Sequence, residues 1–349
     1  MKKLLIIIIV VGLVLTLSFV GCKAAVSEET TAAAETTAAS NELEITKHFQ
    51  IAWLPPDMFN PFWTYQRQGM EKVAFEVFSE KGYRIDISLL APIKVFEVAE
   101  QVAIFENAIQ MAPDGIVVCP TDQNSLVPVV IKAWEAGIPT VGVGGPIIPA
   151  KELLADFEID NFATTAMLGK YTADFLNKDA KAVILSGITG NTLSDWREGG
   201  YKKACEDAGI EVLDTQPANF NRAGGLTLME NYMARFPQID VAFCANDEVA
   251  LGAYEAIVNA GRQDEIKVVG LDGNRDTIQS IIDGGIFCTA NQDPWLQGEL
   301  ALKQLIEYWE GKSKEDIEQK QWFMGTLIDS KNAPNEIGKF AEWEKWYKE

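Results

Sequence analysis

The chain has 349 residues, with 30 Lys and Arg against 50 Asp and Glu, so its formal net charge is −20 at pH 7. Phosphate binding needs clustered Lys and Arg, and this charge therefore argues against a nucleic-acid partner. About 300 residues follow the N-terminal segments, which is more than one hydrophobic core usually holds and predicts two lobes.

The first residues have the composition of a secretory signal. Two lysines precede an apolar run over residues 4–20, which predicts a signal peptide at residues 1–21. A permanent transmembrane anchor is the alternative, but the run ends at Gly21-Cys22. This pair resembles the lipobox of bacterial lipoproteins, and the resemblance implies that Cys22 is lipidated and anchors the protein to a membrane.

A low-complexity stretch of Ala, Thr and Glu follows at residues 24–40. Such a segment has little to bury and cannot offset its ordering entropy, so residues 22–46 are predicted to be a disordered tether. An isolated helix is the alternative, although the threonines weaken it.

From residue 47 apolar runs alternate with segments of helical periodicity. The predicted strands cover residues 50–54, 83–90, 115–119, 140–143, 182–185, 211–215, 241–245, 266–271 and 284–290. The predicted helices cover residues 63–79, 98–111, 125–136, 163–176, 197–207, 226–235, 248–259 and 295–309. This rhythm predicts parallel sheets covered by helices on both faces. It restarts after Asp160-Asn161, which predicts an α/β fold of two doubly wound, Rossmann-like lobes, with residues 322–328 and 337–347 packed back onto the second lobe.

Polar side chains stand at the ends of two predicted strands of the second lobe. Asn246 follows one apolar run and Asp272 follows the next. In open α/β sheets ligands bind beyond the carboxyl ends of the strands, so both residues are candidates for a small-molecule site. Both are also good turn formers, and the local sequence leaves the two explanations at about even weight.

Aromatic residues occur in two further loops between a strand and a helix. Asn60 precedes Pro61, Phe62 and Trp63, and Phe220 lies in the loop of residues 217–225. Helix capping explains Asn60 and Pro61, but not two large aromatics in the first turn. Rings in a cleft suit the apolar face of a sugar, whereas each ring taken singly is more often part of a core.

The loop of residues 187–191 contains two glycines and is followed by Arg197. It lacks the Gly-x-x-x-x-Gly-Lys-Ser/Thr pattern, so nucleotide hydrolysis is not supported. Arg197 is either a solvated or paired side chain or a rigid fork of donors aimed at the oxygens of a ligand.

Catalytic and metal-binding patterns are missing from the sequence. His48 is the single histidine, no nucleophile motif surrounds it, and neither a CxxC pair nor an EF-hand loop occurs. Four cysteines lie in strand-like or helical runs and are expected to be buried free thiols; they are Cys119, Cys205, Cys244 and Cys288. We therefore expect no enzyme activity, metal or cofactor, although paired carboxylates for acid/base chemistry stay open.

Taken together, several motifs resemble a known family. They are NPFW at 60, DGIVVCPTD at 114, AGIPTVGV at 136, DN at 160, WREGGY at 196, CANDEVALGA at 244, VVGLDG at 268 and TANQD at 289. In this order they resemble the type I periplasmic sugar-binding proteins of ABC transporters, especially the ribose-binding branch. Lactose-repressor-type regulators share the core pattern, but they carry an N-terminal DNA-binding segment where this chain has a signal and a tether.

The resemblance implies a fold and a ligand site. It implies two lobes joined by three hinge strands near Asp160, Asn291 and Phe323. The first lobe then comprises residues 47–160 and 293–322, and the second residues 161–292 and 323–349. The ligand-binding residues that it implies are Asn60, Phe62, Trp63, Asn191, Arg197, Phe220, Asn246, Asp272 and Gln292.

One departure from the family bears on the ligand. Ribose binders have an Asp-Arg pair where this chain has Gly144-Gly145, and Pro56 replaces a serine-like donor. The loss of two charged side chains is expected to open space and to disfavour D-ribose, and the sequence does not say which other sugar or polyol replaces it.

The resulting hypothesis is a monomeric, lipid-anchored solute-binding protein outside the cytoplasm. It is expected to deliver a sugar-like ligand to an ABC transporter permease and its ATPase. Reporting the ligand to a chemoreceptor or a sensor kinase is the alternative, and an envelope glycosidase is a third class. Neither the envelope type nor the membrane that holds the anchor can be read from the sequence.

Overall fold

The computed structural model describes residues 44–94, 96–145, 148–177 and 179–348. The predicted signal peptide, the lipidation site Cys22 and nearly all of the predicted tether lie outside these residues. Within the described part of the chain, no helix combines the length and apolar character that crossing a membrane requires.

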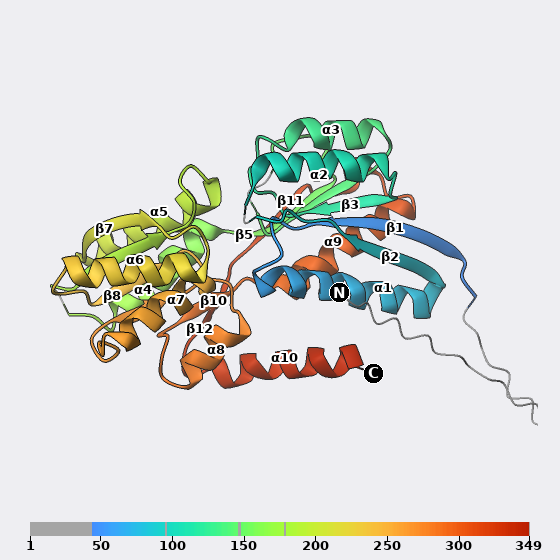
Figure 1. Ribbon diagram of the computed structural model, residues 1–349. Helices are drawn as coiled ribbons and strands as arrows, with labels where there is room; N and C mark the ends of the chain where they lie inside the picture. The colour runs from blue at the N-terminus through green and yellow to red at the C-terminus, as the bar shows by residue number, and fades with distance from the viewer. Residues whose placement is uncertain (1–43, 95, 146–147, 178, 349) are drawn as a thin grey trace, which may run out of the picture. The chain divides into compact units, whose positions relative to one another are not determined.

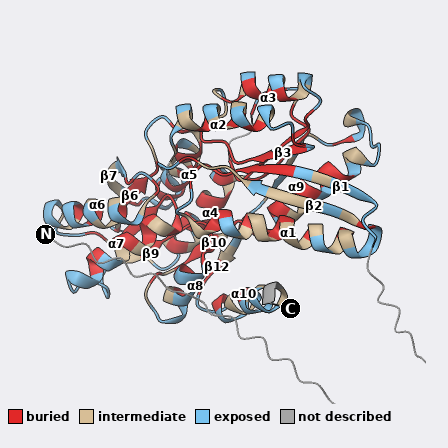
Figure 2. Ribbon diagram, turned by 45° about the vertical axis from the view of Figure 1, so that its right-hand side comes forward, coloured by how far each residue is buried: buried red, intermediate tan, exposed pale blue. Residues whose placement is uncertain are grey.

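The first sheet has six parallel strands in the order β11-β5-β4-β3-β1-β2. The strands are β1 (Lys47–Leu54), β2 (Tyr83–Leu89), β3 (Gly115–Val118), β4 (Thr140–Val143), β5 (Ala155–Ile159) and β11 (Lys320–Phe323). The inner strands β3, β4 and β5 are buried along their whole length. Continuous apolar runs are what parallel strands covered on both faces require, and Figure 2 shows β3 in the colour of buried residues.

Helices cover both faces of this sheet. They are α1 (Pro61–Lys81) and α9 (Pro294–Trp309) on one face, and α2 (Val98–Gln110) and α3 (Val127–Glu135) on the other (Figure 1). Alternate residues of β1 separate the two cores: Ile51 joins α1 and α9, whereas Ala52 joins α2 and α3. α1 and α9 approach closely because Gly69 of α1 and Gly298 of α9 lie at their contact. A Cβ atom at either position would collide with the backbone of the other helix.

The second sheet has four parallel strands in the order β7-β6-β8-β9. They are β6 (Lys181–Ser186), β7 (Glu211–Pro217), β8 (Val241–Cys244) and β9 (Lys267–Val269). α4 (Asn161–Ala173) and α5 (Thr192–Ala208) share one core with this sheet, and α6 (Arg222–Arg235), α7 (Asp247–Asn259) and α8 (Arg275–Ile282) share the other. The predicted α/β fold with parallel sheets is confirmed.

The chain passes three times between the parts of the fold built on the two sheets. The first passage leads from β5 into α4 at Asp160, and the second from β10 (Thr289–Asn291) into α9. The third leads from β11 into β12 (Thr326–Ile328), which pairs antiparallel with β10. The backbone N–H of Asp160 donates to the carbonyl of Phe323 at 2.9 Å, so the first and third passages run side by side.

Some element boundaries differ from those expected. The strand predicted at 284–290 is only β10, because Gly284 and Gly285 form the end of α8, a helix that the sequence pattern did not reveal. β5 was likewise missed. The predicted segment 322–328 is divided into β11 and β12, which belong to different sheets.

The C-terminal helix α10 (Ala333–Lys348) contacts more than the second lobe. It packs on α8. Phe340 also lies 4.7 Å, between ring centroids, from Trp295 of α9 and 5.2 Å from Tyr65 of α1. The helix thus joins elements of both sheets. Residues 43–349 form one compact unit, so the lobe boundaries named above stay a prediction.

Candidate functional site

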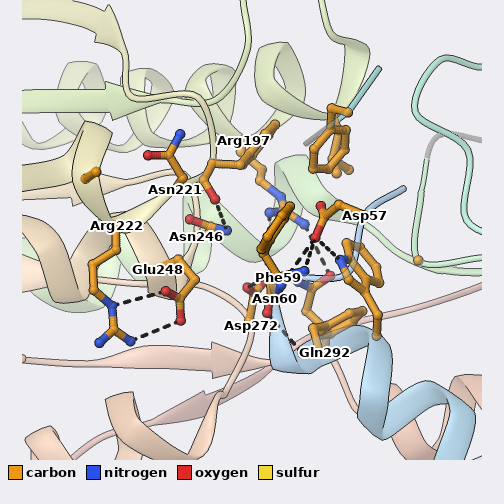
Figure 3. Close-up of a pocket in the computed structure, with 17 residues that line it drawn as sticks. Asp57, Phe59, Asn60, Arg197, Asn221, Arg222, Asn246, Glu248, Asp272 and Gln292 are labelled. Carbon is orange, nitrogen blue, oxygen red and sulfur yellow. Dashed lines mark hydrogen bonds and ion pairs between the residues drawn. The ribbon is translucent and has the colours of Figure 1, made fainter. Parts of the chain in front are cut away.

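A cavity of about 330 Å³ lies where loops that follow strands of the two sheets meet (Figure 3). From the side of the first sheet it is lined by Asp57, Phe59, Asn60, Phe62, Trp63 and Phe96. From the side of the second sheet it is lined by Arg197, Phe220, Arg222, Asn246, Glu248 and Asp272, and Gln292 lies at the second passage between them. Its size is at the lower end of pockets for small ligands, which span about 300–1,000 Å³.

Arg197 is held rigidly at the wall of this cavity. α5 carries it, and its side chain is buried. Its Nε donates to Asn161 Oδ1 at 2.8 Å, Nη1 to the carbonyl of Ala245 at 2.9 Å, and Nη2 to Gln292 Oε1 at 3.3 Å. A guanidinium fixed in this way presents its donors in one orientation, which favours recognition of oxygen atoms.

Asp272 receives hydrogen bonds from both sides of the cavity. Its Oδ2 accepts from Asn60 Nδ2 at 3.1 Å and its Oδ1 from Gln292 Nε2 at 2.5 Å, and Arg197 Nη1 lies 3.9 Å from Oδ1. Burial raises the pKa of the Asp272 carboxyl, while Arg197 and the two amides act in the opposite direction. The backbone of Asp272 has φ +151°, a region that residues other than glycine rarely adopt.

Asp247 lies behind this carboxylate, outside the cavity lining. Its Oδ1 accepts from Thr289 Oγ1 at 2.7 Å and its Oδ2 from the backbone N–H of Asn274 at 2.7 Å. Burial raises the pKa of Asp247, and the nearby Asp272 raises it further. Both of its oxygens are thus used to fix the chain around Asp272.

Asn246 and Phe220 form the neighbouring part of the second-sheet wall. Asn246 caps α7, since its Oδ1 accepts from the backbone N–H of Val249 at 3.0 Å, and its Nδ2 donates to the carbonyl of Phe220 at 3.3 Å. The ring of Phe220 fills the space where a side chain at Gly187 would lie. The glycine-containing loop therefore makes room for an aromatic wall.

Asn60 provides the corresponding polar group on the first-sheet side. Its Oδ1 accepts from the backbone N–H of Phe62 at 3.0 Å and so caps α1. The same oxygen accepts from Asn274 Nδ2 at 3.2 Å. The rings of Phe62 and Trp63 stand edge to face beside it, with centroids 5.0 Å apart.

Contacts join the two walls around the cavity. The amide of Asn60 reaches Asp272, and the rings of Phe96 and Phe220 stack with centroids 5.2 Å apart and an interplanar angle of 28°. Outside the lining, Asn191 Nδ2 donates to the carbonyl of Thr121 at 2.8 Å. The two parts of the fold are thus in contact through both polar and aromatic groups.

Eight of the nine residues expected to bind a ligand line this cavity. Asn191 does not line it, and its part in ligand binding stays a prediction. Its Oδ1 caps α5 by accepting from the backbone N–H of Ser194 at 3.1 Å, and its Nδ2 donates to the carbonyl of Thr121. Both ends of the side chain are therefore occupied outside the cavity.

The packing around Gly144 and Gly145 corrects the expectation that these two glycines open space in the cavity. Gly144 lines the cavity, but a Cβ atom there would lie 2.5 Å from Gln66 Nε2 and 3.4 Å from Phe62 Cε1. A Cβ atom on Gly145 would lie 2.8 Å from Pro120 Cδ. Other side chains have taken the space, so the glycines remove charge from this wall without enlarging the cavity.

Eight lining residues were not expected from the sequence: Asp57, Phe59, Phe96, Leu193, Asn221, Arg222, Ala223 and Glu248. Asp57 and Phe59 lie in the same loop as Asn60, and Glu248 is two residues after Asn246, so proximity to a recognised motif was an available signal. Phe96 lies in the loop between β2 and α2, and no local pattern marks it.

No group of three or more His, Cys, Asp or Glu side chains within the described chain is arranged to hold a metal ion. The four cysteines Cys119, Cys205, Cys244 and Cys288 are buried and free, as expected. The cavity therefore offers hydrogen-bonding groups and aromatic faces.

The chain is similar in sequence to known periplasmic binding proteins. A model described as periplasmic binding protein domain matches residues 51–313. The ribose import binding protein of Bacillus subtilis is 32% identical over 268 residues, which are 76% of this chain and 83% of that protein.

Two solved structures show the same fold. An ABC transporter periplasmic solute binding protein from Actinobacillus succinogenes with bound D-allose is 28% identical, with a TM-score of 0.74 over 82% of this chain and 99% of that one. A solute binding protein from Agrobacterium vitis with bound α-D-tagatopyranose is 25% identical, with a TM-score of 0.75 over 84% and 98% of the two chains.

Two parallel sheets with a cavity between their connecting loops define the class of two-lobed binding proteins. The chain belongs to the periplasmic binding protein domain family. The family resemblance carried by the sequence motifs is thereby confirmed.

Proposed function

We propose that this protein is an extracytoplasmic solute-binding lipoprotein that captures a sugar or polyol between its two lobes and delivers it to an ABC transporter permease. The observation that carries the proposal is the composition of the cavity walls. Rings of Phe62, Trp63 and Phe220 lie beside buried hydrogen-bonding groups of Arg197 and Asp272.

A sugar matches this combination of groups. The apolar C–H face of a sugar ring packs on an aromatic ring, while its hydroxyls need partners, because an unpaired buried polar group costs about 1–3 kcal/mol. A hydroxyl placed between Asn60 and Asp272 would take over the hydrogen bond that now joins them at 3.1 Å. A second hydroxyl would reach Asn246. The known relatives agree, since they are named or described with ribose, D-allose and tagatopyranose.

Capture would involve closure of the lobes about the three passages of the chain. Asn60 and Phe96 on one side, and Asp272 and Phe220 on the other, touch across the cavity. A ligand that bridges both walls stabilises the closed arrangement by its differential affinity for it. A permease would then recognise the closed form by its surface.

The extracytoplasmic location and the lipid anchor draw their support from residues 1–22, with their apolar run and Gly21-Cys22. Delivery to a permease draws its support from the family and from the ABC transporter relatives. A permease and an ATPase encoded beside this chain would favour delivery, whereas a neighbouring chemoreceptor or sensor kinase would favour sensing.

The test is isothermal titration calorimetry of the full-length protein in detergent against monosaccharides, polyols and their amino derivatives. Saturable binding of at least one compound with 1:1 stoichiometry is expected. The bound compound should be recovered unmodified after long incubation, because a glycosidase would convert it. If no compound of any series binds, the proposal fails.

A further inference from the structure

The charges around the cavity do not cancel. Five charged side chains line it, and four of them form two pairs. Arg197 Nη1 lies 3.9 Å from Asp272 Oδ1, and Arg222 Nε lies 3.1 Å from Glu248 Oε2. Asp57 forms no ion pair with any residue of the described chain. The lining therefore carries one uncompensated carboxylate.

This carboxylate is buried, and one of its oxygens is unused. Asp57 is 2% exposed. Its Oδ1 accepts from the backbone N–H groups of Phe59 and Asn60 at 2.7 and 3.3 Å and from Trp63 Nε1 at 3.2 Å. Its Oδ2 accepts no hydrogen bond from the residues that the structure describes. A buried carboxylate without an opposite charge is unfavourable, so a cation supplied by a ligand would be strongly held there.

Aromatic rings line the same cavity as this carboxylate, which Figure 3 labels. Trp63 donates its Nε1–H to Asp57 and stands edge to face with Phe62, and Phe96 and Phe220 stack in the same lining. An ammonium group is attracted by the face of an aromatic ring, and more so where water is excluded. A carboxylate among aromatic rings combines the two interactions that recognise a protonated amine.

No protein cation competes for this position on the first-sheet side. Lys and Arg are missing from its described lining residues. Gly144, the remaining member of that wall, has φ +64°, and a side chain there would collide with Gln66. A lysine or arginine at position 144 therefore could not supply a counter-charge for Asp57 unless the wall moved.

We propose that the ligand is a sugar or polyol that carries a protonated amine, with the amine bound by Asp57 Oδ2 and the neighbouring rings. This rests on the proposed function, because it assumes that the cavity binds a sugar-like molecule. Asp272 and Asn246 would bind its hydroxyls, while Asp57 sets the preference for an amine over a hydroxyl.

The experiment compares matched ligands by calorimetry on the full-length protein in detergent at pH 7. The probes are glucosamine, galactosamine, mannosamine and an amino-inositol, each against its hydroxyl counterpart and, for the sugars, its N-acetyl derivative. At least one amine is expected to bind about 10- to 100-fold more tightly than its two neutral counterparts, which is the range of one charge-assisted hydrogen bond.

Two variants assign this preference to Asp57. In Asp57→Asn the preference is expected to fall to within about threefold, because the isosteric amide keeps the Oδ1 acceptor but loses the charge. Asp264→Asn is the matched control: it also removes a carboxylate, but an exposed one outside the cavity lining. It should keep the preference.

Three outcomes would overturn the inference. Wild-type protein that binds neutral sugars as tightly as their amines contradicts it directly and needs no variant, and the proposed function then still stands. A preference that survives in Asp57→Asn with native circular dichroism also contradicts it. If no sugar or amine binds at all, the inference and the proposed function fail together.

Discussion

Asp272 is the residue at which the hydrogen bonds of the cavity converge. It joins Asn60 from one side to Gln292 and Arg197 from the other. Its backbone lies in a region that costs about 1–3 kcal/mol for a residue other than glycine. Such strain persists where the surrounding structure over-determines it. A simple turn at Asp272-Gly273 would not need a carboxylate with this set of partners.

Replacing Asp272 by Asn should weaken sugar binding without unfolding the protein. The charge-assisted hydrogen bonds to hydroxyls would be lost, and affinity should fall about 10- to 100-fold. Calorimetry with the best compound of the screen measures this. Asp264→Asn, an exposed change outside the cavity lining, is the control. Unchanged affinity in Asp272→Asn would remove the carboxylate from the site.

At the scale of elements, helix capping and cavity lining turn out to be compatible. Asn60, Asn191 and Asn246 cap α1, α5 and α7, and two of them also line the cavity. In a parallel α/β fold the helix N-terminus that follows a strand lies at the same edge where ligands bind. One asparagine can therefore cap with its oxygen and face the cavity or the other wall with its amide.

Asn191 allows this dual use to be tested away from the ligand. Asn191→Ser keeps a capping oxygen for α5 but is too short to reach the carbonyl of Thr121, 2.8 Å from the amide in the native protein. One lost hydrogen bond across the lobes should lower sugar affinity about 2- to 10-fold.

Stopped-flow fluorescence should show this loss mainly as faster dissociation, because the bond belongs to the closed arrangement. The temperature midpoint of unfolding serves as the control for the cap and should change little. Affinity equal to wild type would show that the Asn191–Thr121 contact does not contribute to closure.

At the scale of the whole molecule, several ionisable carboxyl groups are buried, one of them on β5 next to the first passage between the sheets. Glu158 on β5 accepts from Asn161 Nδ2 at 3.0 Å, and Asn161 in turn accepts from Arg197 Nε. Burial raises the pKa of Glu158 to about 8. It also raises the pKa of Asp156, whose two oxygens have no hydrogen-bond partner among the residues that the structure describes, and that of Asp247.

Stability should therefore fall as pH rises from about 6 to 8.5. These carboxyls hold protons in the folded state that the unfolded chain has already released above its ordinary pKa. Each carboxyl that still holds its proton in the folded state but is ionised in the unfolded chain lowers the free energy of unfolding by up to about 1.4 kcal/mol per pH unit. It stops contributing once the folded state has also released that proton. Exposed carboxylates with lowered pKa, such as Asp86, stay ionised throughout and do not contribute.

Urea denaturation at several pH values measures this slope. In Glu158→Gln the share of Glu158 should disappear, because the amide cannot ionise, and the curve should be flatter up to about pH 8. A wild-type protein whose stability is constant or rises across this range would contradict the burial argument.

Local patterns were sufficient for most of the elements and for eight of the residues that line the cavity. Continuous apolar runs at residues 115–119 and 241–245 predicted β3 and β8, because buried parallel strands need such runs. The polar residues that end strands and the aromatics of NPFW led to the cavity lining. β5 was missed, since Asp156 and Glu158 interrupt its apolar pattern while being buried with it.

By itself the sequence determined the α/β class, the parallel sheets and the family, because alternating apolar periodicity and strand-end residues are local properties of the chain. Only the tertiary structure decided that Asn191 faces Thr121 and not the cavity, that Gln66 and Phe62 occupy the space above Gly144, and that Asp57 is left without a counter-charge. Each of these depends on which residues far apart in the chain come together in the fold, and no local sequence pattern encodes that.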